Sequence, residues 1–410
     1  MFMRTRTARF HAVSLAFLLA LSGCNNLDRI ANAAHDDATQ NTTSIRSLAR
    51  AAPGAANLTP AIVAQNRNTE KLLSLRGVVG TGAGLDANGN PSVVVFVEQR
   101  GVAGIPAKLD GVPVTVVVSG RIEAVRPVSQ GLAYGKGGRY GNVTGGGGGG
   151  VTDTSGSGTG GGTVDTSGTG GGTTGGGSVC NIIPPSSRFP RPVPIGVSTG
   201  NPFLSAGTIG ARLRNNATGQ LFVLSNNHVY ANVNQVSIGV NVLQPGPYDG
   251  GLNHVDSIGS LAAYEIVKFC DASGYCPPNV IDAAIASTTA AKVDNATPCD
   301  GYGAPSSTTV TPLVGMAVKK YGRTTGLTVS TISAVNVYVK VSYGNGLTAL
   351  FTGQVYIESG TFSSGGDSGS LIVSDAGNPV ALLFAGNSTC SVGNPIGAVL
   401  TRFNASIDGI

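Results

Sequence analysis

The chain has 410 residues, of which 62 are Gly and none is Trp, and its formal net charge is +5. This length corresponds to two or three domains and allows a sizeable core. Only 11% of the residues are charged, and with so many glycines this composition favours short strands, tight turns and linkers over long surface helices. The composition therefore argues against an all-α protein.

The first 23 residues have the pattern of an export signal. Arg4, Arg6 and Arg9 precede the apolar run "FHAVSLAFLLALSG", which is too short for a good membrane span. The run ends in "LSGC", which is similar to the lipobox of bacterial lipoproteins, so we expect Cys24 to be lipidated and to become the new N-terminus. The alternative is an ordinary secretory signal with a chance cysteine.

Removal of residues 1–23 takes away three arginines and no acidic residue, which leaves a net charge of about +2 and argues against a nucleic-acid partner. No later segment has the roughly 18 unbroken apolar residues of a transmembrane helix, so we expect the protein to be attached to the membrane only through the lipid on Cys24. The predicted location is the bacterial cell envelope, at the outer membrane of a Gram-negative cell, or the exterior after processing.

The next segments predict a polar tether and a small domain. Residues 24–56 are polar and Ala-rich without a sustained period. In 57–128, "TPAIVAQNRNTEKLLSL" has helical spacing, and "GVVGTGAGL", "SVVVFVEQ" and "VPVTVVVSG" are strand-like. The turn "DANGNP" between the first two runs predicts a hairpin. Residues 57–128 are thus expected to form a small α+β domain.

A linker is predicted over residues 129–194. Its centre, Gly145 to Ser178, repeats Gly, Ser and Thr and offers too little apolar surface to fold. The repeated Asp153 and Asp165 allow the alternative of a calcium-binding array, which the lack of a regular nonapeptide argues against.

Residues 195–410 predict a mainly β fold, a barrel or a sandwich. Many short strand-like runs are separated by turn signals, and in "VNVYVKV" Val335 begins an alternation of Val with polar residues that is typical of a half-buried strand. Only the last dozen residues, "IGAVLTRFNASI", have a helical pattern.

The cysteines predict disulfides, because an exported protein meets an oxidising compartment and no CxxC pair or nearby His gives zinc-site spacing. The first expected bridge joins Cys270 and Cys276 across the turn "DASGY", and the second joins Cys299 and Cys390, leaving Cys180 unpaired. We expect no metal and no cofactor.

Three histidines remain after residue 23, so a mechanism that depends on His has few candidates. His35 lies in the tether, His228 ends the strand-like run "LFVLSNNHV", and His254 lies in a Gly-rich turn. Asp282, in "NVIDAAIAS", is an acid at the head of a small apolar strand, where it can orient an imidazole. A competing base and acid, His254 with Asp256, has no serine motif nearby.

The stretch "SSGGDSGSLIV" places Ser368 in a tight glycine turn. A serine hydroxyl needs a base to take its proton and donors for the oxyanion that forms. Because Gly366 and Gly369 carry no side chains, the backbone can expose the hydroxyl and aim N–H groups at one point. Ser368 is therefore the candidate nucleophile.

The order His228, Asp282, Ser368, with "NNHV", "DAAIA" and "GDSGS", resembles the chymotrypsin-like serine peptidases. The runs "VKKYGRTTGLTVSTISAV" and "GQVYIESGTFSSGGDSGSLIV" are more similar to the bacterial streptogrisins and α-lytic protease, and also to the trypsin-like proteins grouped with the plant narrow-leaf regulator. The resemblance covers about residues 200 to 403. It implies a double β-barrel, preceded here by the small α+β domain and the Gly-rich linker.

The resemblance also implies a role for each residue of the motifs. Ser368 would attack the scissile carbonyl, His228 would act as general base and then general acid, and Asp282 would orient His228. The backbone N–H groups of Gly366 and Ser368 would form the oxyanion hole. In the streptogrisin type the acid before the serine is paired with a basic residue, which the alignment of "VKKYGRTTG" places at Lys320.

We therefore predict an ion pair between Asp367 and Lys320 that shapes the oxyanion loop, with Arg323 as the alternative partner. Departures from the family pattern are Asn227 before the histidine and Ser370 in "GSL", which are expected to alter the walls of the site. Phe362 stands at the expected floor of the specificity pocket and argues against a preference for Lys or Arg.

The predicted function is that of a lipid-anchored serine endopeptidase with a protein or peptide substrate. Two alternatives are a degenerate peptidase domain that binds peptide without cutting it and a structural protein of the envelope. By position and size, residues 57–128 are similar to the pro-region of the streptogrisin type, and a spacer or docking module is the alternative. The sequence does not indicate an oligomeric state.

Overall fold

The computed structural model describes residues 57–124, 180–203 and 206–410. The chain divides into two units at residue 60. Of the first unit the structure describes only residues 57–60. Helix α2 (Thr59–Leu73) begins there and continues into the second unit. Cys24, His35, Asp153 and Asp165 lie outside the described residues, as do the predicted signal, the tether, the core of the linker and the boundary at 128.

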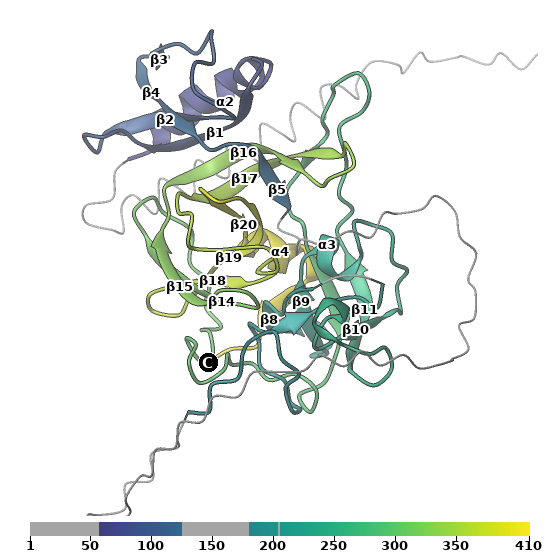
Figure 1. Ribbon diagram of the computed structural model, residues 1–410. Helices are drawn as coiled ribbons and strands as arrows, with labels where there is room; N and C mark the ends of the chain where they lie inside the picture. The colour runs from purple at the N-terminus through teal and green to yellow at the C-terminus, as the bar shows by residue number, and fades with distance from the viewer. Residues whose placement is uncertain (1–56, 125–179, 204–205) are drawn as a thin grey trace, which may run out of the picture. The chain divides into compact units, whose positions relative to one another are not determined.

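One large sheet dominates the described chain. Its strands are β1 (Val78–Leu85), β2 (Pro91–Val97), β3 (Lys108–Leu109), β4 (Val112–Val118), β5 (Ile122–Ala124), β12 (Pro278–Asn279), β14 (Ala317–Gly322), β15 (Gly326–Thr331), β16 (Ala334–Ser342), β17 (Thr348–Ile357), β18 (Leu371–Ser374), β19 (Pro379–Gly386) and β20 (Ser391–Pro395). Most of these strands are labelled in Figure 1. Their order is β15-β14-β18-β19-β20-β17-β16-β1-β2-β4-β3, with β12 beside β17 and β5 beside both β16 and β19.

A second sheet carries the segments around the two predicted triad residues His228 and Asp282. Its strands are β8 (Ala211–Asn215), β9 (Leu221–Ser225), β10 (Asn241–Leu243), β11 (Ser257–Tyr264), β13 (Ala284–Ser287) and β21 (Ala405–Ile407), in the order β10-β11-β13-β9-β8-β21. The other described elements are the strand pair β6 (Ser198–Thr199) and β7 (Gly207–Thr208), and the helices α3 (Asn227–Tyr230), η1 (Pro247–Asp249) and α4 (Ile396–Phe403).

The expected mainly β fold is confirmed, and the two larger sheets divide the described chain into two halves. Short β-branched runs form these strands because they fit a pleated surface that is buried on one face. In β16 the predicted alternation holds for Val337, Val339 and Val341, which are fully buried, while a bulge with Asn336 at φ +52° interrupts it near the start. A shared cluster that includes Leu224 and Leu382 packs the two halves together.

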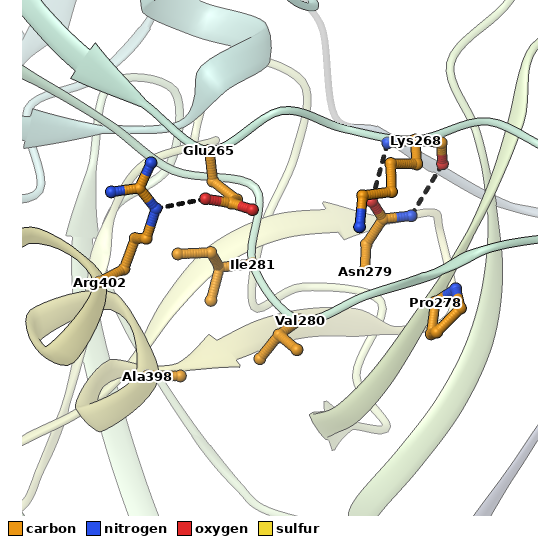
Figure 2. A pocket seen from close by; sticks show the side chains of 8 residues that line it. All are labelled: Glu265, Lys268, Pro278, Asn279, Val280, Ile281, Ala398 and Arg402. Carbon is orange, nitrogen blue, oxygen red and sulfur yellow. Dashed lines mark hydrogen bonds and ion pairs between the residues drawn. The ribbon is translucent and has the colours of Figure 1, made fainter. Parts of the chain in front are cut away.

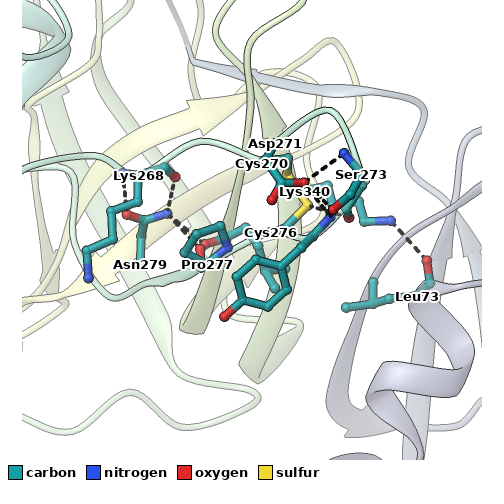
Figure 3. The surroundings of a disulfide bond; sticks show 12 residues. Leu73, Lys268, Cys270, Asp271, Ser273, Cys276, Pro277, Asn279 and Lys340 are labelled. Atoms are coloured by element: carbon teal, nitrogen blue, oxygen red, sulfur yellow. Dashed lines mark hydrogen bonds between the residues drawn. A yellow bond between two sulfur atoms is a disulfide. The ribbon is translucent and has the colours of Figure 1, made fainter.

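The module of residues 57–124 contains the predicted helix and hairpin. Helix α2 and the antiparallel pair β1–β2 confirm both expectations, and β4 joins β2 in parallel. The edge of this module continues into the large sheet, because β1 pairs antiparallel with β16. Lys340 of β16 also donates a hydrogen bond of 2.9 Å to the carbonyl of Leu73 at the end of α2 (Figure 3).

Residues 180–194 differ from the expected linker. Val193 is fully buried in the core of the second sheet, and its N–H donates to the carbonyl of Lys292 at 2.9 Å. Phe189 is buried as well, with its N–H bonded to the side chain of Gln244 at 3.1 Å. Apolar side chains that follow the "GGGS" run closely are therefore buried in the core. The folded region after the glycine-rich segment begins at about Cys180, which is bonded to Cys299.

The disulfides confirm one predicted pair and correct the other. Cys270 and Cys276 are bonded across their short turn (Figure 3). Cys299 is bonded to Cys180 and not to Cys390. The reason is burial: Cys390 is a free thiol in the core of the large sheet, at the start of β20, whereas Cys299 lies in an outer loop beside residues 180–181.

Candidate active site

His228 lies in a short helix that directly follows β9. The sequence predicted that His228 ends a strand-like run, and the structure has the four-residue helix α3 at this position. Asn226 anchors the start of the helix by donating from its side chain to the carbonyl of Asp282 at 2.7 Å. Asn227 is fully buried and bonds the carbonyl of Glu265 and the side chain of Asn234, so it supports the helix from within instead of lining a wall.

The structure places His228 against Asp282. The ring Nδ1 lies 2.7 Å from Oδ2 of Asp282, and the backbone N–H of His228 donates to Oδ1 at 3.1 Å. Tyr343 donates its hydroxyl to the same Oδ2 at 2.7 Å. The backbone N–H of Asp282 donates to the Asn394 side chain at 3.0 Å, so the backbone that carries the carboxylate is held as well.

Asp282 is fully buried, yet it is held in the ionised form. Burial would raise the pKa of Asp282, but the charge of His228 and the hydrogen bonds from His228 and Tyr343 outweigh it and lower the pKa below the usual value. An ionised carboxylate can only accept, so Nδ1 of His228 carries the proton in that bond. Nε2 is then the basic nitrogen; it is buried and has no hydrogen-bond partner among the described residues.

Ser368 lies in a turn just before β18, in the other half of the molecule. Its carbonyl accepts from Thr208 N–H at 2.7 Å, and the next residue, Gly369, has φ +94°. A Cβ at Gly369 would lie 2.2 Å from the hydroxyl of Ser225, so only glycine fits there. Because Ser225 ends β9, three residues before His228, this close approach brings the serine turn to the segment that carries the histidine.

A second glycine supports the same placement. A Cβ at Gly207 would lie 2.5 Å from the side chain of Val229 and 3.0 Å from the carbonyl oxygen of Ser368. Val229 is the residue after His228, so the flanks of the candidate base and of the candidate nucleophile approach the same backbone position.

Gly366, predicted as an oxyanion donor, has φ +99°. Its carbonyl accepts from the Thr208 hydroxyl at 2.9 Å, while its N–H has no acceptor among the described residues. A Cβ on Gly366 would come within 2.6 Å of the Thr324 hydroxyl, so the tight turn requires glycine. This geometry leaves a backbone donor available beside Ser368.

Asp367 is held by the loop that follows β14. Its carboxylate accepts from the N–H groups of Thr324 and Thr325, at 2.8 and 3.2 Å, from the Thr325 hydroxyl at 2.7 Å and from Ser364 N–H at 2.9 Å. Lys320 Nζ lies 3.7 Å from Oδ2, and both side chains are fully buried. Burial lowers the pKa of Lys320 to about 8, against the opposing effect of Asp367.

Arg323, the alternative partner for Asp367, is bonded to Asp249 instead. Its Nε donates to Asp249 at 2.9 Å, and a second nitrogen pairs with the other carboxylate oxygen. Ser370, the other departure from the family pattern, donates its hydroxyl to the carbonyl of Asp367 at 2.6 Å. Its hydroxyl therefore stabilises the turn and does not line a pocket.

Phe362, predicted at the floor of the specificity pocket, is fully buried in a core cluster with Val318, Ile357 and Ile372. Its ring lies 5.8 Å from Lys320 Nζ. The side chain is therefore part of the support beneath the Asp367 loop, and its carbonyl accepts from Thr328 at 2.7 Å.

The competing pair of His254 and Asp256 is not brought together with a serine. Asp256 is bonded to Arg188 through two nitrogens, at 2.8 and 2.7 Å, while His254 is exposed at φ +69°. The guanidinium of Arg188 is the main cause that lowers the pKa of Asp256. This carboxylate therefore ties a loop together and does not orient an imidazole.

Tyr343 and Asn394 contact Asp282 but were not predicted as site residues. Tyr343 follows the alternating strand β16, and alternation marks only which side chains are buried, not which of them carry a hydrogen bond to the site. Asn394 lies in "SVGNPIG", where nothing in the local pattern separates a loop amide from a partner of a buried acid.

The structure has a pocket of about 250 Å³ (Figure 2). It is lined by Glu265, Lys268, Pro278, Asn279, Val280, Ile281, Ala398 and Arg402. The pocket contains none of the predicted site residues, although Ile281 directly precedes Asp282. Arg402 of α4 and Glu265 form an ion pair at one side of the pocket.

Within the described ranges no group of three His, Cys, Asp or Glu side chains could hold a metal ion. The same residues include no helix that is long and apolar enough to cross a membrane.

No protein-family model and no curated protein matches the chain. Among solved structures, it is similar to a glutamic acid specific serine protease, at 20% identity over 52% of this chain and 100% of that one, with a TM-score of 0.37. It is also similar to Thermobifida fusca protease A, at 18% identity over 53% of this chain and 99% of that one, with a TM-score of 0.37. Cellulomonas bogoriensis chymotrypsin is 18% identical over 53% of this chain and 99% of that one, with a TM-score of 0.36. Identities this low leave the function to be argued from the residues of the site.

Proposed function

We propose that the chain is a serine endopeptidase that hydrolyses peptide bonds through Ser368, His228 and Asp282. The observation that carries this proposal is the buried pair of His228 and Asp282, whose Nε2 is the one basic ring nitrogen. It lies on a segment that the glycine turn of Ser368 approaches closely. A base oriented by an acid beside a serine is the arrangement that makes a hydroxyl nucleophilic.

In the proposed mechanism Ser368 Oγ attacks the scissile carbonyl carbon while its proton passes to Nε2 of His228. Asp282 stabilises the imidazolium that forms. The new oxyanion accepts hydrogen bonds from the N–H groups of Gly366 and Ser368. His228 then returns the proton to the leaving amine as the C–N bond breaks, which leaves an acyl-enzyme on Ser368. Water repeats the sequence and releases the acid product.

The Ser368→Ala substitution tests this mechanism. We expect cleavage of a peptide library to fall by about 10⁴-fold or more, because the residues of a triad act as a unit. Labelling by a fluorophosphonate probe, which reacts only with an activated serine, should disappear as well. Ser388→Ala is the matched control, since Ser388 is exposed and lies outside the site, and it should retain both signals.

The alternative function, a degenerate domain that binds peptide without cutting it, gives a different result in the same experiment. It predicts that the wild-type protein is neither labelled nor active, while peptides are still retained. Labelling that survives in Ser368→Ala would assign the nucleophile to another residue. The export and lipid anchoring predicted from residues 1–24 stay predictions, as does the nature of the protein or peptide substrate.

A further inference from the structure

Tyr343 is an unassigned contact of the candidate catalytic acid. We propose that it is a positioning residue, which fixes the carboxylate of Asp282 and through it the imidazole of His228. This inference rests on the proposed function of the same three residues. It adds a fourth side chain to them, one that follows β16 of the large sheet and not the sheet that carries the segments around His228 and Asp282.

The hydrogen bonds to Asp282 define its rotation. Oδ1 accepts from the backbone N–H of His228, while Oδ2 accepts from both His228 Nδ1 and the Tyr343 hydroxyl. A carboxylate with donors on both oxygens cannot turn about its Cβ–Cγ bond without breaking one of them. The Tyr343 hydroxyl therefore helps to fix the plane of the carboxylate, so that one of its two equivalent oxygens stays directed at the imidazole.

Tyr343 is itself held firmly. The side chain is only 4% exposed, and its ring makes edge contacts with His228, at 6.2 Å between centroids, and with Phe269, at 5.5 Å. Phe351 stacks on it at 6.3 Å. Aromatic rings packed at these distances restrict the tilt of the phenol, so its hydroxyl arrives at Asp282 already oriented.

The backbone around Tyr343 explains why this position is stable. Tyr343 directly follows β16, and its N–H closes the turn to β17 by donating to the carbonyl of Leu347 at 2.9 Å. The first residue of β17, Thr348, accepts from Cys270 N–H at 2.8 Å. The disulfide loop that begins at Cys270 is therefore attached to the same hairpin, and Phe269 extends from it onto the tyrosine ring.

The Tyr343 hydroxyl also affects the electrostatic potential at His228. A neutral donor stabilises the ionised carboxylate and partly neutralises it, so less negative potential reaches His228. Without the donor, the imidazolium form of His228 would gain stability. Loss of the hydroxyl should therefore both loosen the orientation of the acid and make His228 harder to deprotonate.

Tyr343→Phe removes only this hydroxyl and keeps the ring. We expect kcat to fall roughly tenfold or more, since hydrogen bonds to charged groups are among the stronger ones, with KM little changed because Tyr343 has no proposed contact with substrate. The acid limb of the kcat/KM profile should move to higher pH. A purely structural role would lower the thermal midpoint and leave that limb in place.

Tyr356→Phe is the matched control. Tyr356 is a buried tyrosine of the same hydrophobic cluster, and its hydroxyl interacts with the thiol of Cys390 and not with a residue of the site. This variant should retain the wild-type kcat and acid limb. Replacement of Tyr343 by 3,5-difluorotyrosine gives the opposite test, because the ring shape is nearly kept and the hydroxyl becomes a stronger donor, so the acid limb should move to lower pH.

One further measurement separates this inference from the proposed function. The proton between His228 and Asp282 can be followed by NMR as a downfield resonance in the full chain, whether or not the protein cleaves peptides. A resonance that shifts in Tyr343→Phe but not in Tyr356→Phe supports the positioning role even if the protein is inactive. An active protein whose kcat, acid limb and resonance are the same in Tyr343→Phe and wild type would overturn it.

Discussion

Two buried carboxylates, Asp282 and Asp367, are each surrounded by donors but differ in the cation they face. Asp282 faces the imidazole ring of His228, whereas Asp367 faces the ammonium group of Lys320. Lys320 also donates to the hydroxyl of Thr325 and to the carbonyl of Gly326 at 3.0 Å. The contacts of the first carboxylate fix an imidazole ring and those of the second fix a loop, although both are fully buried.

The burial of Lys320 has a consequence for stability at high pH. Its folded pKa of about 8 lies below the unfolded value of 10.5, so above pH 8 the unfolded chain binds the proton more tightly. The free energy of unfolding contributed by this group should therefore rise between about pH 8 and 10.5 and be constant below that window. In Lys320→Met this rise is absent.

Urea unfolding at pH 7 and pH 10 measures the difference. The free energy of unfolding of wild type relative to Lys320→Met should increase by about 2 to 3 kcal/mol between these two conditions, at about 1.4 kcal/mol for each pKa unit. Lys319→Met is the control, because Lys319 is its partly exposed neighbour on β14. An equal difference at both pH values would mean that Lys320 keeps its proton in the folded state throughout.

At the scale of single residues, the sequence was informative where a motif fixes the neighbours of a residue. His228, Asp282 and Asp367 could be named because each stands in a short motif with a known chemical logic. Tyr343 could not, since its contact with Asp282 joins positions 61 residues apart and depends on the three-dimensional path of β16. The predicted bond between Cys299 and Cys390 was wrong for the same reason, because the partner of a cysteine also depends on the path of the chain in three dimensions.

At the scale of the secondary-structure elements, glycines at alternate positions allow strand β1 to pack closely against strand β16. In β1, Gly80, Gly82 and Gly84 alternate along the strand. A Cβ at Gly80 would lie 2.6 Å from the carbonyl oxygen of Tyr338, and one at Gly82 would lie 2.9 Å from Val337. The glycines let β1 approach β16 closely, because the missing side chains leave room for the backbone and the valines of β16.

Gly80→Ala is therefore expected to disturb the pairing of β1 with β16. The added methyl group meets backbone, which cannot move aside as a flexible side chain can, so the free energy of unfolding should fall by about 1 to 3 kcal/mol. Gly397→Ala is the control: Gly397 is exposed in α4 with open space around it, and its substitution should be neutral or stabilising by up to about 1 kcal/mol. Chemical denaturation of both variants gives the comparison, and an unchanged midpoint for Gly80→Ala would contradict the crowding.

Most strands could be predicted, because alternation and turn residues act over a few positions. Helix α3 was missed because four residues are too few to show a helical period. The run "GVVGTGAGL" was correctly predicted as a strand, but its partner was not predictable, since β16 lies some 250 positions further along the chain. Local patterns determine the type of element; partners depend on long-range packing.

At the scale of the molecule, one hydrophobic cluster contains residues from both sides of the glycine-rich segment. Val79 and Phe96 of the N-terminal module are packed with Val339 and Tyr356 of the large sheet, and the rings of Phe96 and Tyr356 are 4.2 Å apart. Strand β5 adds pairs with β16 and β19. The module is thus joined to the sheet by backbone pairing and by a shared core.

Cleavage of the chain between residues 145 and 178 tests whether this joint holds by itself. With a specific protease site inserted in that segment, we expect the two fragments to elute together in size-exclusion chromatography in native buffer, because strand pairing and buried apolar surface remain intact. They should separate only in denaturant. Two separate native peaks directly after the cut would show that the covalent connection, and not the joint, keeps the module in place.

The pairing of β1 with β16 also determines how long such an association lasts. Release of the module would require β16 to lose a neighbouring strand and the cluster around Phe96 to open to water, so the barrier resembles that of unfolding and not that of ligand dissociation. Small domains commonly cross such barriers on times from under a second to days. Even with the chain cut, the lifetime of the complex would then be set by an unfolding rate, so the module would stay in place for as long as the folded sheet itself persists.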